Sequence, residues 1–173
     1  MIIWITGITA SGKSTLSLML YNELKKNKKL NVLRLDGDEL RNKKNFFKGH
    51  DLDTRWKNLE IIVNLIKEEL IKYDIFIVAT VSHVQEMRQF ARNNLDNFHE
   101  IYLSCDSNIC ENRDYKGLYN KAKLLDANDS EMFPGVTVPY EISKKPELII
   151  DTGNTSISLS FKKLLSYVNK IGN

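Results

Sequence analysis

The chain begins with Ile2-Ile3-Trp4-Ile5-Thr6, an apolar run that leads directly into Gly7-Ile8-Thr9-Ala10-Ser11-Gly12-Lys13-Ser14-Thr15. The second stretch has the spacing G-x-x-x-x-G-K-[ST], and it lies between a predicted buried strand and a predicted helix, the context this motif requires. Its glycines allow backbone N–H groups to turn toward phosphate oxygens, and the helix start adds unpaired N–H groups and a positive dipole end. The motif therefore predicts a phosphate-binding loop (P-loop) for ATP or another nucleoside triphosphate, with Mg²⁺.

The P-loop residues have separate expected roles. Lys13 would reach the β- and γ-phosphates as a catalytic cation, and the hydroxyl of Ser14 would bind Mg²⁺. The alternative interpretation is a glycine-rich turn before a surface helix, which the complete motif in its strand–loop–helix setting disfavours. The residues expected to bind ATP through this loop are Gly7, Ala10, Ser11, Gly12, Lys13, Ser14 and Thr15.

Length and composition indicate one globular domain that spans residues 1–173. The chain is 42% hydrophobic and 27% charged, which is ordinary, and its formal net charge of +3 is too small to argue for nucleic-acid or membrane binding. No leader segment and no apolar stretch of membrane-spanning length is evident. Cys105 and Cys110 lack a metal-binding spacing and would lie on different faces of a helix. We therefore expect reduced thiols that pack in the interior of a cytoplasmic protein.

Strands and helices alternate along the chain. Short apolar runs predict strands at residues 2–6, 31–35, 75–79, 98–103 and 147–150. Apolar stripes and capping residues predict helices at residues 13–27, 53–72, 85–95, 106–113 and 156–170. The second of these helices would be capped by Asp53 or Thr54. Residues 114–140 are polar and contain two of the chain's 3 prolines, so we expect an irregular, mobile segment there.

This alternation predicts an α/β fold in which a five-stranded parallel sheet is covered by helices on both faces, through right-handed crossovers. Ligands of such sheets bind beyond the carboxyl ends of the strands. The segments that follow the predicted strands should therefore line one rim together with the P-loop. These segments are residues 36–38, 80–83 and 105–106.

Two carboxylates are expected at this rim. Asp36 and Asp38 follow the second predicted strand, where one of them can hold a Mg²⁺-bound water or accept the proton of an attacking hydroxyl. The third predicted strand ends without an acidic residue, so this pair is the best source of carboxylate near the metal. We therefore expect Lys13, Asp36 and Asp38 to be catalytic, and Ser14 and Asp36 to hold the metal. The alternative is a turn with aspartates at its corners.

Cationic and aromatic residues point to an acceptor substrate that carries an anionic group and a flat base. Arginine forks match oxyanions, and the candidates are Arg41, Arg55, Arg88 and Arg92, each of which could instead be a surface charge. The candidates to sandwich a base are Phe46, Phe47 and Phe133, with core packing as the alternative. Of the histidines, His83 is expected to face the site, whereas His50 and His99 are expected to be structural or exposed.

Motifs spread over most of the chain fit one known pattern. Residues 36–41 read D-G-D-E-L-R, and residues 55–58 read R-W-K-N. Residues 110–122 read C-E-N-R-D-Y-K-G-L-Y-N-K-A, and residues 133–136 and 139–141 read F-P-G-V and P-Y-E. These stretches resemble D-G-D-x-[LIV]-R, R-x-x-N, C-E-x-R-D-x-K-G-L-Y-K-K-A, F-T-G-I and P-Y-E of the adenylyl-sulfate kinase (APS kinase) family.

The resemblance covers about residues 2–152 and implies a P-loop kinase. Such an enzyme moves the γ-phosphoryl group of ATP to the ribose 3′-hydroxyl of a nucleotide with a small anionic group on its 5′-phosphate. By resemblance, Asp36 is the base or the metal-side carboxylate, Arg113 contacts ATP, and a lid at about residues 114–140 closes over the nucleotides and excludes water. The family also implies a homodimer. The residues expected to bind the acceptor are Asp38, Arg41, Phe47, Arg55, Asn58, Ser82, Lys116, Leu118 and Phe133.

Departures from the family pattern fall mostly on the acceptor side. Ser82-His83 stands where the family has S-P, Thr54 replaces an Asp, and the segment between Arg41 and Arg55 is shortened. Two acceptors therefore stay open. One is adenylyl sulfate, which would give 3′-phosphoadenylyl sulfate in sulfate assimilation. The other is implied by resemblance to a divergent relative of this family, which phosphorylates cytidine diphosphoramidate, a precursor in capsular polysaccharide biosynthesis. The alternative from another class is a non-catalytic P-loop nucleotide-binding protein.

Overall fold

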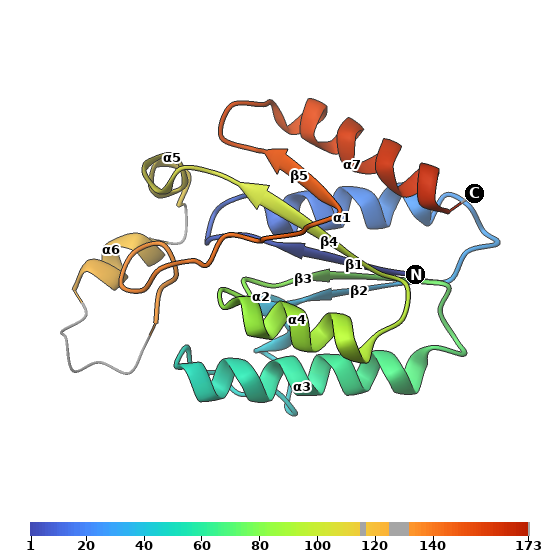
Figure 1. Cartoon of the computed structure of the whole chain (residues 1–173), viewed down its shortest axis with the longest axis horizontal. Coiled ribbons are helices and arrows are strands. Elements are labelled where there is room, and N and C mark those ends of the chain that lie inside the picture. Colours follow the sequence, from blue (N-terminus) through green and yellow to red (C-terminus); the bar gives the residue numbers. More distant parts are fainter. Residues whose placement is uncertain (115–116, 125–131, 173) are drawn as a thin grey trace.

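The computed structural model describes residues 1–114, 117–124 and 132–172 as alternating strands and helices (Figure 1). The strands are β1 (Ile2–Thr6), β2 (Val32–Asp36), β3 (Ile75–Ala79), β4 (Phe98–Ser104) and β5 (Leu148–Asp151). The helices are α1 (Lys13–Leu24), α2 (Gly37–Leu40), α3 (Leu52–Glu69), α4 (Gln85–Asn94), α5 (Ser107–Asn112), α6 (Leu118–Lys123) and α7 (Ile157–Ile171).

The strands form one 5-stranded sheet in the order β2-β3-β1-β4-β5, and all neighbours are parallel. Helices α1 and α7 cover one face, and α3 and α4 cover the other, while α5 and α6 lie beyond the carboxyl ends of the strands (Figure 1). This arrangement confirms the predicted fold class. Because β1 is the central strand, the loop that follows it opens in the middle of the rim.

The side chains of β1 show how both faces become buried. Ile2 and Trp4 belong to the apolar cluster under α3 and α4, whereas Ile3 and Ile5 belong to the cluster under α1 and α7. Successive strand residues point to opposite faces, and a parallel sheet covered on both sides therefore needs apolar residues throughout. The uninterrupted apolar run at the start of the chain is thus explained.

Three local features differ from the sequence predictions. Helix α3 is capped by Asp51, whose carboxylate accepts a hydrogen bond from the backbone N–H of Thr54 at 2.8 Å, so the expected cap at Asp53 or Thr54 is wrong. The short helix α2 directly after Asp36 was not predicted. Helix α6 lies inside the segment that was expected to be irregular. The mobility of the lid stays a prediction, and residues 115–116 and 125–131 lie outside the described residues.

Both cysteines are free thiols, as expected. The expected geometry was wrong, however, because Cys105 precedes α5 and packs against the small cluster that contains Cys110, Ile8 and Tyr119. In the part of the chain that the structure describes, none of the helices combines the length and the apolar composition that crossing a bilayer requires.

The central strand provides a test of the core. Trp4 is fully buried and its ring centroid lies 5.6 Å from that of Phe98. We expect Trp4→Ala to lower the free energy of unfolding by about 3–5 kcal/mol, because the lost burial leaves a large cavity. The control is Ile71→Ala at a fully exposed position, which should change it by less than about 0.5 kcal/mol. Denaturant titration measures both, and equal effects would contradict the assigned packing.

Candidate active site

The P-loop follows β1 through two backbone positions that favour glycine. Gly7 has φ 151°, and a Cβ atom there would lie 2.7 Å from the carbonyl oxygen of Leu103. Gly12 has φ 98° and is the N-cap of α1, where it provides no side chain to bond the first N–H groups of the helix. The loop can therefore approach β4 closely and leaves the helix start open to a ligand.

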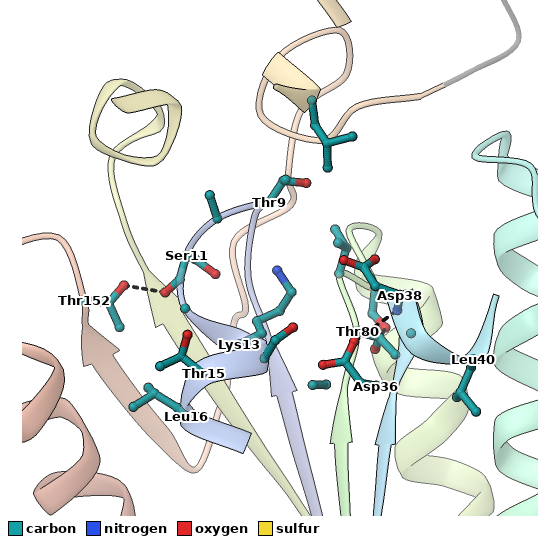
Figure 2. A pocket seen from close by; sticks show the side chains of 18 of the residues that line it. Thr9, Ser11, Lys13, Thr15, Leu16, Asp36, Asp38, Leu40, Thr80 and Thr152 are labelled. Carbon is teal, nitrogen blue, oxygen red and sulfur yellow. Dashed lines mark hydrogen bonds between the residues drawn. The ribbon is translucent and has the colours of Figure 1, made fainter. Parts of the chain in front are cut away.

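Residues from distant parts of the chain hold the P-loop in place. The hydroxyl of Thr152 donates to the carbonyl oxygen of Ser11 at 2.9 Å (Figure 2), and that of Tyr119 in α6 donates to the carbonyl oxygen of Thr9 at 3.0 Å. Lys13 Nζ donates to the carbonyl oxygen of Ile8 at 2.7 Å. These contacts give three loop carbonyls hydrogen-bond donors from the protein itself, which suits a loop that binds an anion through its N–H groups.

A cavity of about 550 Å³ opens at the carboxyl ends of the strands. It collects most of the predicted site residues on one surface, and its volume falls in the usual range for ligand sites. The predicted residues that line it are Ala10, Ser11, Gly12, Lys13, Ser14, Thr15, Asp36, Asp38, Arg41, Arg55, Asn58, Ser82, Arg113, Leu118 and Phe133. Gly7 does not line the cavity, because its close approach to β4 places it at the base of the loop.

Lys13 and the carboxylate pair face one another across the cavity. In Figure 2 the Lys13 side chain extends toward the side on which Asp36 and Asp38 lie. Burial lowers the pKa of Lys13 to about 8, and the negative charges of Asp38 and Asp36 oppose this shift. Phosphate oxygens beside this partly desolvated ammonium would add negative charge and favour its protonated form.

The donor set fits a magnesium ion held together with nucleotide phosphates. Asp36 is buried at the end of β2, and Ser14 is an exposed residue on the first turn of α1 that lines the same cavity. Among the described residues, no group of three or more His, Cys, Asp or Glu side chains could hold a metal by itself. Magnesium commonly binds through one or two protein oxygens, substrate phosphates and waters, so an all-protein cage is not needed.

Arg41 lines the cavity and was predicted to bind the acceptor. Its Nε atom is buried and has no hydrogen-bond partner among the described residues, and burial lowers the pKa of its guanidinium while Asp38 opposes this shift. A buried donor without a partner is costly, so an oxyanion of the substrate would stabilise this side chain.

Asn58 binds the protein backbone. Its amide accepts from the N–H of Phe47 at 2.9 Å and donates to the carbonyl oxygen of Phe47 at 2.9 Å. The ring of Phe47 itself is 48% exposed, lies 5.5 Å from Lys57 Nζ, and does not line the cavity. The structure thus differs from the expectation for Phe47, and its neighbour Phe46 lines the cavity instead.

Arg55 joins two loops at the cavity mouth. Its Nε donates to the carbonyl oxygen of His50 at 2.8 Å, and its Nη2 donates to that of Met132 at 2.7 Å. The imidazole of His50 lies 5.6 Å from the ring of Phe133, and both residues line the cavity. His50 was expected to be structural or exposed. In the sequence it lies between the predicted site residues Arg41 and Arg55, and this placement could have indicated that it belongs to the site.

Arg88 and Arg92 do not line the cavity, so the interpretation that they face an acceptor anion is wrong. Arg88 is fully buried on α4, where it donates to the carbonyl oxygen of Ser82 at 2.5 Å and pairs with Glu100 at 3.1 Å. Arg92 forms an ion pair with Glu147 at 2.6 Å. Both arginines pair with distant residues and brace the structure behind the site.

The segment after β3 contributes Ser82, which has φ 40° and lines the cavity. His83 is buried beside it and does not line the cavity, contrary to the expectation. Burial, and next the charge of Arg55, lower the pKa of His83 to about 4, which keeps the imidazole neutral at pH 7. Residues 105–106 also do not line the cavity. The predicted acceptor residue Lys116 lies outside the described residues.

Comparison with known proteins agrees with this geometry. The model of the adenylylsulphate kinase family matches residues 1–151. An adenylyl-sulfate kinase from Bacillus pumilus is 38% identical over 171 residues, which cover 98% of this chain and 85% of the relative. A probable adenylyl-sulfate kinase from Bacillus subtilis is 34% identical over 171 residues, which cover 98% of this chain and 85% of the relative.

Solved structures show the same likeness. The Mycobacterium tuberculosis APS kinase in complex with AMPPNP and APS has a TM-score of 0.81 and 26% identity, over 97% of this chain and 96% of that chain. Shikimate kinase from Aquifex aeolicus, at a TM-score of 0.59 and 16% identity over the whole of both chains, shares the fold alone. Because the family model matches most of its length and these relatives align with nearly all of it, the chain belongs to the adenylyl-sulfate kinase family of phosphotransferases.

Proposed function

We propose that the protein transfers the γ-phosphoryl group of ATP to the ribose 3′-hydroxyl of adenylyl sulfate. The observation that carries this proposal is the placement of Lys13 and the start of α1 opposite Asp36 and Asp38 in one cavity. Such an arrangement can hold a triphosphate on one side and aim a hydroxyl group at it from the other. The family supports the acceptor, since a relative was solved with APS.

The protein's contribution to this reaction is positioning and charge. The P-loop N–H groups and Lys13 would hold the β- and γ-phosphates in line with the acceptor hydroxyl. Asp36 or Asp38 would accept the hydroxyl proton as the new O–P bond forms, while the bond from the γ-phosphorus to the bridging oxygen breaks and ADP leaves. Ser14 and Asp36 would hold Mg²⁺, which supplies charge neutralisation at the phosphate oxygens when bound.

On the acceptor side, the side chains that line the cavity divide between binding and support. Arg41 would bind an anionic group of the acceptor, and His50 with Phe133 would form the wall against its base. Arg55 and Asn58 would hold the loops that carry this wall. Arg113, Leu118 and Lys116 would belong to a lid that closes over both nucleotides and protects the phosphoryl group from water.

A second candidate acceptor is cytidine diphosphoramidate. It stays a candidate because His83 stands directly after the cavity residue Ser82, at the position where the family pattern has proline, although the imidazole itself is buried outside the cavity lining. The predicted homodimer and cytoplasmic location remain predictions.

Turnover with defined acceptors tests the proposed function. We expect the purified protein with Mg-ATP to release ADP on addition of adenylyl sulfate, and a 3′-phosphorylated product to appear. Cytidine diphosphoramidate is the parallel substrate, and adenosine 5′-monophosphate, which lacks the sulfate, is the control. Turnover with cytidine diphosphoramidate alone would select the second candidate. ATP binding without turnover of either acceptor would favour the non-catalytic alternative.

The Lys13 ammonium should matter for the rate. We expect Lys13→Met to lower kcat/KM by at least about 100-fold, because the transferring phosphates lose a positive charge that the site had positioned. Steady-state kinetics with saturating acceptor measure this effect. The matched control is Lys57→Met on α3, outside the cavity lining, and near-normal turnover of the Lys13 variant would contradict the assignment.

The same lysine should make stability depend on pH. Because burial lowers the pKa of Lys13 to about 8 in the folded protein, from its ordinary value of 10.5, the unfolded chain binds more protons between these limits, so folding stability rises with pH there. Lys13→Met lacks this contribution. We compare the free energies of unfolding of the wild type and the variant without nucleotide. As the pH rises from 7.5 to 9.5, the wild type should gain stability relative to the variant. A pH-independent difference would contradict the shifted pKa.

A further inference from the structure

Arg34 is a β2 residue that neither the P-loop motif nor the acceptor motifs include. Its side chain is only 9% exposed and points to the α1 face of the sheet. Three of its nitrogens have separate partners. Nη2 donates to Asp36 Oδ2 at 2.6 Å, Nε donates to Ser17 Oγ at 2.9 Å, and Nη1 donates to Glu39 Oε1 at 2.8 Å.

Two of these partners lead to the groups that would hold magnesium. Asp36 is contacted directly. Ser17, which is fully buried on α1, contacts the backbone of the second residue: its hydroxyl donates to the main-chain carbonyl oxygen of Ser14 at 3.0 Å, so it can fix where the Ser14 backbone lies, and the Ser14 hydroxyl with it. Arg34 therefore connects β2 with the first turn of α1 through one guanidinium group. Residues two apart on a strand share a face, which is why Arg34 can reach Asp36 at all.

The contact also fixes how the Asp36 carboxylate is turned. Oδ1 accepts from the backbone N–H of Asp38 at 3.1 Å, while Oδ2 is bound by Arg34. Rotation of the carboxylate would break both hydrogen bonds. A planar guanidinium matches this task because its donors have fixed directions, which a lysine ammonium cannot reproduce for three partners at once.

We propose that Arg34 is a positioning residue for the magnesium site, which holds Asp36 and Ser14 at the separation that Mg-ATP requires. The inference rests on one part of the proposed function, that the protein binds Mg-ATP, and does not depend on which acceptor is phosphorylated. Partners that orient metal ligands typically contribute about 10- to 100-fold to metal affinity. The third partner, Glu39, has a side chain 64% exposed and lies outside the cavity lining, so it should contribute little to this role.

Calorimetric titration of ATP with and without Mg²⁺ tests the proposal without any turnover. For Arg34→Gln we expect the affinity for ATP in EDTA to stay within about threefold of the wild type, while the gain in affinity on adding Mg²⁺ falls by about tenfold or more. Arg34→Lys, which keeps the charge, should recover part of this gain. Glu39→Gln is the matched control and should behave like the wild type.

A double-variant cycle separates positioning from general destabilisation. In the Asp36→Asn background, Arg34→Gln should change the Mg²⁺-dependent gain by less than about threefold, because its main partner is already altered. Equal effects of Arg34→Gln in both backgrounds, or an unchanged gain in the single variant, would overturn the proposal. If Arg34→Gln does not fold, as thermal unfolding would reveal, Arg34→Lys serves in the same cycle. Failure of the kinase assay with intact Mg-ATP binding would count only against the proposed function.

Discussion

The backbone N–H groups at the start of α1 have no partners within their own helix. The site depends on these groups because they are available to bind an anion. Gly12 caps the helix without a side chain, and the loop carbonyls of Thr9 and Ser11 are held by Tyr119 and Thr152. An unsatisfied helix start with its positive dipole end attracts an anion. The surrounding residues therefore stabilise a loop whose own hydrogen bonding becomes complete only when a phosphate group is bound.

Local patterns were enough to predict much of the fold. The bounds of β1 and β3 agree with the prediction, because short apolar runs in a doubly covered sheet stand out in the sequence. The four-residue helix α2 was missed because it is too short to show any periodicity. Helix α6 was missed because its six residues lie in a long polar segment, where composition alone indicates a loop.

The site residues also divide into those that local sequence patterns predict and those that they do not. The P-loop was predictable because its chemistry lies within nine consecutive residues. The role of Arg88 was not, because its partners Glu100 and Glu141 come from distant parts of the chain and only folding brings them together. The contacts of Arg55 with two loop carbonyls were invisible in the sequence for the same reason. A motif thus predicts which residues gather at a site more reliably than what each of them binds.

The side of the cavity where we propose that the acceptor binds is built largely by loops that brace one another. Arg55 links the loop at His50 to the loop at Met132, and Asn58 holds the backbone of Phe47. These contacts involve backbone groups: any residue can provide the carbonyl oxygens, and any residue except proline can provide the N–H. Side chains on the same loops can therefore change without loss of the support, which gives a physical reason why the segment between Arg41 and Arg55 can depart from the family pattern.

The hydrogen bonds from Tyr119 and Thr152 to the P-loop have a consequence for synthesis on the ribosome. The loop is made first, but both of its braces, and the strands β3 and β4 that flank β1, emerge later. Contacts so distant in sequence form late, since a long chain segment must first be closed. A nascent chain would thus remain unable to capture nucleotide until nearly all of it has been translated.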